Sequence, residues 1–119
     1  MDILHVDFKE RIPMTGGTYR RTPPRDFAAD PQHWPDTTVP DHGQARVVLT
    51  IAQALERHIA RQGYSLRQVA AATGVNRQVV ANLLGGASWI DVVTVSLLED
   101  GLDVVLWPGA TVRASTVGR

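Results

Sequence analysis

The most regular hydrophobic pattern of this chain lies in its middle third. Five apolar residues recur there at spacings of three and four, as on one face of a helix: Val48, Ile51, Ala52, Leu55 and Ile59. Asp41 and Gln44 have the spacing of a capping box at the start of this helix, and Gly63 is typical of its end.

Two shorter helices are predicted next. Ser65 and Gln68 have the spacing of a second capping box, and Gly74 interrupts the helix that they begin. Asn76 is a good N-cap for a third helix, which should end at Gly85.

A fourth helix is predicted from the Ser88 and Asp91 caps to about Asp100, with Gly101 just beyond it. Residues 92–95 are β-branched and favour a strand. The cap, the length and the closing glycine together favour a helix.

Two short strands are predicted near the ends of the chain. Residues Ile3 to Phe8 alternate between apolar and polar side chains, as in a half-buried strand. Leu102 to Trp107 form a second apolar run, which Pro108 and Gly109 terminate. We expect these strands to pair within a chain or between two chains, because an isolated pair is only marginally stable.

Proline divides the chain. Residues 1–43 hold all but one of the 7 prolines, and three of them exclude a regular element over 28–41: Pro31, Pro35 and Pro40. The predicted organisation is an N-terminal strand with a proline-rich extended arm over 1–43, a helical domain over 44–108 and a flexible tail over 109–119.

The fold class predicted from these elements is mainly α, a bundle of four to five helices with short N- and C-terminal strands. A length of 119 residues suits one such domain, and 44% hydrophobic residues can supply its core. Without cysteine, disulfides and thiolate chemistry are excluded. No segment has the ~20 apolar residues that span a bilayer, and residues 1–10 do not resemble a signal peptide, so we expect a cytoplasmic protein without a membrane partner.

The formal net charge is zero, but the charge is unevenly distributed. Residues 44–86 hold five of the 12 basic residues and one of the 12 acidic ones, which leaves them at +4 and the remainder of the chain at −4. Such a basic block is typical of a surface that faces phosphate, and it is equally compatible with an ordinary solvated helix face.

The segment from Ser65 to Leu84 has the residue types that two closely crossed helices need. Ala70 is small enough for a close crossing, and Gly74 can adopt the positive φ of a tight turn. Four apolar residues can join the helices from inside: Val69, Val75, Val80 and Leu83. This combination predicts a helix-turn-helix motif.

At these residues the chain resembles the Cro/lambda-repressor-like (Xre) family of helix-turn-helix proteins. The resemblance extends from about Val48 to Pro108 and includes a Leu98-Glu99 … Leu102 … Leu106-Trp107-Pro108 pattern. It implies a lambda-repressor-like bundle in which the second helix of the motif reads DNA. Leu66 departs from the family, which often has a polar phosphate contact there, and Gly101 should end the last helix early.

The predicted recognition helix is Asn76 to Leu84. Its buried face should hold Val79, Val80, Leu83 and Leu84. The residues expected to contact bases lie on the other face: Asn76, Arg77, Gln78, Ala81 and Asn82. Arginine can bind guanine through two atoms, asparagine and glutamine can bind adenine in the same way, and Ala81 could touch a thymine methyl group.

Phosphate contacts are expected at the start of the preceding helix, from Ser65, Arg67 and Gln68. Ser65 and Gln68 should also cap the helix, and Arg67 is equally well read as a solvated charge. Three arginines of the arm could enter a minor groove or serve only solubility: Arg20, Arg21 and Arg25.

We therefore expect a sequence-specific transcriptional regulator that binds double-stranded DNA as a homodimer on a pseudo-palindromic operator. One alternative is an antitoxin whose arm, Thr15 to Pro40, wraps a protein toxin and folds on binding. Another is an architectural DNA-binding protein without sequence preference.

Catalysis, cofactors and a metal site are not expected. The four histidines lack the close spacing of metal ligands: His5, His33, His42 and His58. The three tryptophans are expected to be core or interface anchors: Trp34, Trp89 and Trp107.

Overall fold

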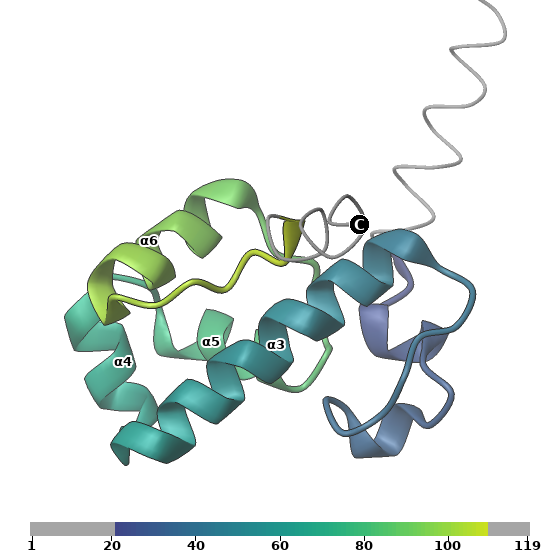
Figure 1. The fold of residues 1–119 in the computed structure, drawn as a ribbon, viewed down its shortest axis with the longest axis horizontal. Coiled ribbons are helices and arrows are strands. Elements are labelled where there is room, and N and C mark those ends of the chain that lie inside the picture. Colours follow the sequence, from purple (N-terminus) through teal and green to yellow (C-terminus); the bar gives the residue numbers. More distant parts are fainter. Residues whose placement is uncertain (1–20, 110–119) are drawn as a thin grey trace, which may run out of the picture.

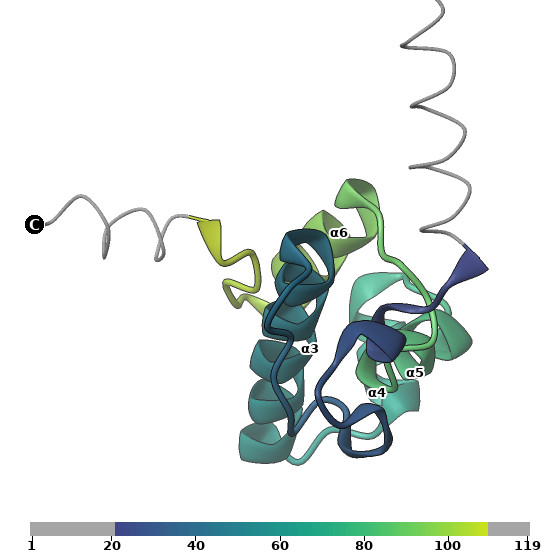
Figure 2. The same ribbon diagram turned by 90° about the vertical axis from the view of Figure 1, so that its right-hand side faces the viewer.

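The computed structural model describes residues 21–109, and this part of the chain is mainly helical. Two short 3₁₀ helices come first, followed by four α-helices: η2 (Pro24–Phe27), η3 (Pro31–His33), α3 (Gly43–Gln62), α4 (Leu66–Thr73), α5 (Arg77–Leu84) and α6 (Val92–Leu102). The long helix α3 crosses the bundle beside α4, α5 and α6 (Figures 1 and 2). None of the helices within residues 21–109 is both long and apolar enough to cross a bilayer.

The N-cap of the longest helix, α3, lies one residue later than predicted. The N-cap is His42, whose Nδ1 accepts a hydrogen bond from the Ala45 amide at 3.1 Å, so the predicted Asp41–Gln44 capping box is wrong. The predicted end is confirmed, because Gly63 adopts the left-handed conformation (φ 70°) and its amide binds the Ile59 carbonyl.

The predicted caps of α4 and α5 are confirmed. The Ser65 hydroxyl accepts from the Gln68 amide, and the Gln68 side-chain oxygen accepts from the Ser65 amide, which completes a capping box. Gly74 ends α4 with φ 76°, and the Asn76 side chain caps α5.

The last helix, α6, starts and ends later than its sequence pattern predicts. Its N-cap is Asp91, whose carboxylate accepts from the Thr94 amide at 2.7 Å, and Ser88 lies outside it. Gly101 lies within the helix, which ends at Leu102 with Asp103 in the left-handed conformation. The expectation that Gly101 ends this helix is therefore wrong.

The predicted strand from Leu102 to Trp107 is wrong, since residues 104–107 have no regular secondary structure. The Leu106 and Trp107 amides donate to the Glu99 carboxylate at 2.8 and 2.9 Å instead of pairing with a strand. No strand occurs in the described range, and the predicted strand Ile3–Phe8 and residues 110–119 of the tail lie outside it. Residues 102–107 therefore cannot join two chains by the strand pairing that the sequence predicts.

The described part of the expected arm is folded against the helical domain. Pro24, Trp34, Pro35 and Val39 are buried, and η2 packs against α3. The expectation that residues 28–41 hold no regular element is wrong at η3, because proline at the first position of a 3₁₀ turn, as in η2 and η3, needs no amide donor. Residues 21–42 therefore extend the core that the sequence assigns to residues 44–108.

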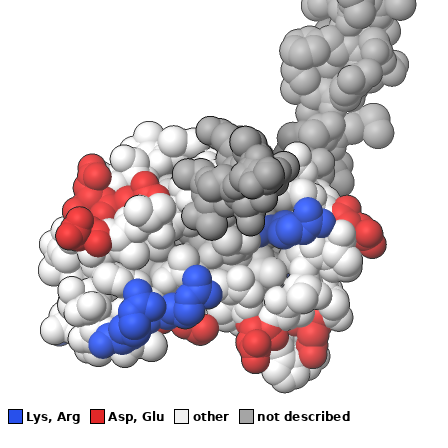
Figure 3. Space-filling model, viewed as in Figure 1, with Lys and Arg blue, Asp and Glu red and all other residues white. Residues whose placement is uncertain are grey.

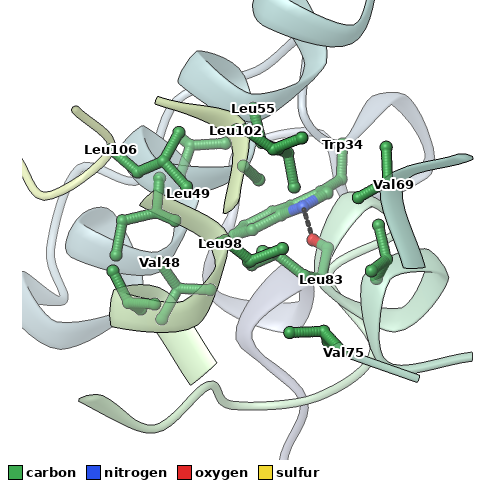
Figure 4. Close-up of a cluster of buried hydrophobic side chains, with 14 of the residues drawn as sticks. Trp34, Val48, Leu49, Leu55, Val69, Val75, Leu83, Leu98, Leu102 and Leu106 are labelled. Atoms are coloured by element: carbon green, nitrogen blue, oxygen red, sulfur yellow. Dashed lines mark hydrogen bonds between the residues drawn. The ribbon is translucent and has the colours of Figure 1, made fainter. Parts of the chain in front are cut away.

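One hydrophobic core joins these elements (Figure 4). Its buried members come from every α-helix and from the segments before and after them: Trp34, Val39, Ala45, Val48, Leu49, Ile51, Ala52, Leu55, Val69, Val75, Val80, Leu83, Val95, Leu98, Leu102 and Leu106. The helical stripe predicted for α3 is confirmed, with Ile51, Ala52 and Leu55 fully buried and Ile59 partly buried. This core fixes α4 and α5 relative to α3.

Candidate nucleic-acid interface

A three-residue turn joins α4 to α5. Gly74 supplies the positive φ, Val75 is buried against the core, and Asn76 starts the next helix. The Thr73 hydroxyl donates to the Val69 carbonyl at 2.7 Å and accepts from the Val75 amide at 3.1 Å. This buried hydroxyl links helix and turn, a role that its position in the sequence does not reveal.

The two helices pack through the predicted apolar residues. Val69 and Val80 are fully buried, and Leu83 is 2% exposed. Val79 was expected on the buried face of α5 but is 40% exposed, because it lies at the edge of the contact, beside a shallow pocket. The buried face of α5 is therefore narrower than predicted.

The N-terminal face of α5 is polar and points away from the core. Asn76, Arg77 and Gln78 are exposed, while Ala81 and Asn82 are partly buried. No hydrogen bond or ion pair within residues 21–109 engages the Arg77 guanidinium, so its donors are available. Four of the five predicted base-contacting residues thus lie on α5 and the fifth, Asn76, caps it, and the three exposed ones are at its N-terminal end.

The amide side chains on this face are hydrogen-bonded to the protein itself. Asn76 Oδ1 accepts from the Gln78 amide at 2.7 Å. One turn further on, Gln78 Nε2 donates to Asn82 Oδ1 at 3.0 Å. Because an amide group has two N–H donors and an acceptor, Gln78 keeps its carbonyl oxygen and one N–H for another partner.

The start of α4 carries the three residues expected at phosphates, and all three are exposed. Ser65 and Gln68 already bind each other's backbone in the capping box, so the Ser65 O–H and the Gln68 NH₂ group are their remaining donors. Arg67 lies between them. The first amides of α4 also lack intrahelical partners, as at any helix start.

The distribution of charge favours phosphate binding on the side of the molecule that carries α4 and α5. No acidic residue occurs between Glu56 and Asp91, a stretch that includes α4 and α5 and carries four arginines: Arg57, Arg61, Arg67 and Arg77. Figure 3 shows basic side chains gathered over the C-terminal half of α3, which leads into α4, and acidic ones over the C-terminal end of α6. Helices α4 and α5 thus carry no carboxylate of their own that would repel phosphate.

The arm arginines have different surroundings. Arg20 lies outside the described residues, and Arg21 is exposed at their start. Arg25 lies at the C-terminal end of α5, where its Nη1 donates to the Gly85 carbonyl at 3.2 Å. The structure therefore does not bring Arg25 together with the exposed N-terminal face of α5.

A shallow pocket of about 190 Å³ borders α5 on the side of Asn82. Val79 and Leu83 line it from α5, Trp89 from the connecting loop, and Asp91 from the start of α6. The Thr94 backbone amide, with help from the Thr94 hydroxyl, holds the pKa of Asp91 below its usual value. Asp91 is therefore ionised at neutral pH, and it places a negative charge beside the polar face of α5.

No protein-family model, curated protein or solved structure matches this chain. The function must therefore be inferred from the arrangement of its own residues. That arrangement consists of two short helices with a tight turn, an exposed polar helix start, and no carboxylate on either helix.

Proposed function

We propose that α4 and α5 form a helix-turn-helix that binds double-stranded DNA with α5 in the major groove. The observation that carries this proposal is the outward-facing, acid-free N-terminal face of α5, held on two core residues, Val80 and Leu83. Side chains in such a position reach base edges when a recognition helix enters the groove.

Within this proposal Arg77 and Gln78 read bases directly. The Arg77 donors fit the two acceptors of guanine, and the remaining oxygen and N–H of Gln78 fit adenine. Asn82 supports Gln78 through their mutual hydrogen bond and contacts a base with its own NH₂ group. The partly buried Ala81 leaves room for close approach to a thymine methyl group.

The phosphate contacts come from the start of α4. Donors are present there on the Ser65 hydroxyl, the Gln68 side-chain NH₂ group, Arg67 and the unpaired backbone amides of the first turn. Contacts of this kind set the register of α5 on the duplex without reading sequence.

The binding unit in this proposal is a homodimer that occupies a pseudo-palindromic operator and thereby regulates transcription. One eight-residue recognition helix reads only a few base pairs, so two half-sites are needed for useful specificity. Large apolar side chains suited to a contact between copies are exposed on α6 and the segment after it: Val92, Val93, Leu97, Val105 and Trp107. Leu97→Glu should therefore yield a monomer by sedimentation at micromolar concentration, whereas Gln62→Glu, at an exposed position of α3, should leave the dimer intact.

Selection of bound sequences from random duplex DNA tests the proposal. We expect enrichment of a pseudo-palindrome whose half-sites are separated by about one helical turn. Binding that depends on salt but enriches no sequence would instead identify a DNA-binding protein without sequence preference.

A further inference from the structure

The C-terminal end of α5 is fastened by a segment far away in the sequence, residues 22–39, which we call the strap. Trp34 Nε1 donates to the Leu83 carbonyl at 3.3 Å (Figure 4). The Arg25 amide donates to the Gly86 carbonyl at 3.1 Å, and Arg25 Nη1 donates to Gly85. The Leu83 carbonyl also accepts from the Gly86 amide at 3.1 Å, and Gly85 and Gly86 follow the last residue of α5, so the strap adds donors to the end of the helix and to the turn after it.

The contact is also sterically tight. Trp34 is 8% exposed, and its ring lies among the labelled core residues. A Cβ built on Gly86 would be 2.6 Å from the Trp34 ring and 2.8 Å from the Arg25 Cβ. The strap therefore approaches the end of α5 more closely than a residue with a side chain at position 86 would allow. Gly86 is buried with φ 68°, which further requires glycine.

The strap is held in turn by the long helix and by the loop after α5. Gln53 of α3 donates to the Pro35 carbonyl at 3.0 Å, and Arg46 donates to the Val39 carbonyl at 2.9 Å. Trp89 Nε1 donates to the Thr22 carbonyl at 3.0 Å. In Figure 2 the strap lies in front of the bundle, and these hydrogen bonds connect it to α3 as well as to the end of the proposed recognition helix.

We propose that the strap sets the orientation of α5, with Trp34 and Arg25 as positioning residues for base reading; this inference rests on the proposed function. An eight-residue helix is about 12 Å long, and its buried residues are Val80 and Leu83. A tilt about those two side chains would move the N-terminal face by distances that break hydrogen bonds to bases, which tolerate only tenths of an ångström. Fastening the C-terminal end removes that freedom.

Two substitutions test this role in the full-length chain. Trp34→Phe removes the N–H donor and keeps an aromatic ring, and Arg25→Met removes the Nη1 donor from an exposed side chain whose loss should not prevent folding. Tyr64→Phe is the matched control, because it also removes one hydrogen-bonding group and keeps the ring, and Tyr64 is 36% exposed and packs against His58 of α3. Each variant is measured by amide hydrogen exchange and by DNA binding.

In hydrogen exchange, we expect residues 77–87 to exchange roughly two- to tenfold faster in Trp34→Phe and Arg25→Met, the effect of one lost hydrogen bond, while residues 45–62 are unchanged. Tyr64→Phe should leave residues 77–87 as in wild type. Unchanged exchange in both strap variants, or equal acceleration throughout the protein, would overturn the positioning role.

In DNA binding, the ratio of affinities for the selected sequence and for a shuffled duplex should fall roughly threefold or more in the strap variants. General destabilisation would reduce the active fraction for both duplexes equally and leave this ratio unchanged, which would also overturn the inference. If the wild type selects no sequence, the proposed function fails, and the exchange result alone decides whether the strap fixes α5.

Discussion

Gly101 of α6 lies directly against Thr73 of α4. A Cβ built on Gly101 would be 2.7 Å from the Thr73 Cα and 2.6 Å from the Ala72 carbonyl oxygen. Both neighbours are backbone atoms, which cannot turn aside as a flexible side chain can. The close crossing of α4 and α6 therefore depends on the absence of a side chain at this position.

Gly101→Ala should destabilise the protein by about 1–3 kcal/mol, because the added methyl group forces the two helices apart. The steric cost outweighs the gain of up to about 1 kcal/mol that alanine brings within a helix. Urea denaturation checks the prediction, with Gly43→Ala as control. Gly43 begins α3 with nothing within 4 Å of its Cβ position, so that change should be neutral or slightly stabilising, and equal effects at both sites would contradict the crossing.

Glu99 holds the segment after α6 in place. Its Oε2 accepts hydrogen bonds from the Leu106 and Trp107 amides, and Leu106 is 2% exposed. Glu99→Ala should lower the free energy of unfolding by about 1–3 kcal/mol and accelerate hydrogen exchange at residues 104–107. Asp100→Ala, at the exposed neighbouring position, should change neither quantity. Equal behaviour of the two variants would show that the Glu99 hydrogen bonds do not hold this segment.

The Thr73 hydroxyl should matter more than its size implies. Thr73→Val removes the buried acceptor of the Val75 amide while nearly preserving volume, so we expect a loss of about 1–3 kcal/mol. Thr73→Ser keeps both hydrogen bonds and should be closer to wild type in thermal denaturation. A serine variant that is less stable than the valine variant would show that the methyl group, and not the hydroxyl, determines this site.

The Asp91 cap makes α6 sensitive to acid. Because the folded-state pKa of Asp91 lies below its usual value, its ionised form stabilises the fold above the unfolded pKa, and this contribution is lost as the pH falls through the folded pKa. Asp91→Asn retains a capping side chain that does not ionise. Between pH 5 and about 2.5 the free energy of unfolding should fall less steeply for Asp91→Asn than for wild type. If the free energy of unfolding fell equally steeply with pH in both proteins, Asp91 would not be the source of the acid sensitivity of α6.

Local signals in the sequence were sufficient for most of the helical fold. Ser65 with Gln68, Gly74 and Asn76 specify the boundaries of α4 and α5, because caps and turns depend on residues close in sequence. Local signals gave the wrong prediction at Gly101. This glycine does not end α6 but permits its close packing on α4, which lies nearly thirty residues earlier in the chain. A glycine that ends a helix and one that permits close packing look alike in a single sequence.

The strap could not be predicted for a similar reason. Proline spacing predicted no regular element over residues 28–41, where the structure has only the short η3, but it gave no indication that Trp34 and Arg25 bind carbonyls at the end of α5. Those contacts span 49 and 60 positions of the chain. Trp34, a large aromatic residue within the proline-rich segment, was a local signal that the segment packs. Residues 102–107 were misassigned as a strand, because the Leu106 and Trp107 amides bind the Glu99 carboxylate and not a neighbouring strand.

The central claim is that the N-terminal face of α5 reads base sequence, and Arg77 tests it most directly. Affinities of wild type, Arg77→Ala and Arg57→Ala are compared for the selected duplex and for a set with each base pair changed in turn. Both variants lose one positive charge, but Arg57 lies on α3. We predict that Arg77→Ala loses about 1–3 kcal/mol on the selected duplex and its preference at one position of each half-site, while Arg57→Ala weakens binding to all duplexes alike. An Arg77→Ala variant that keeps the full base preference of the wild type would contradict the claim.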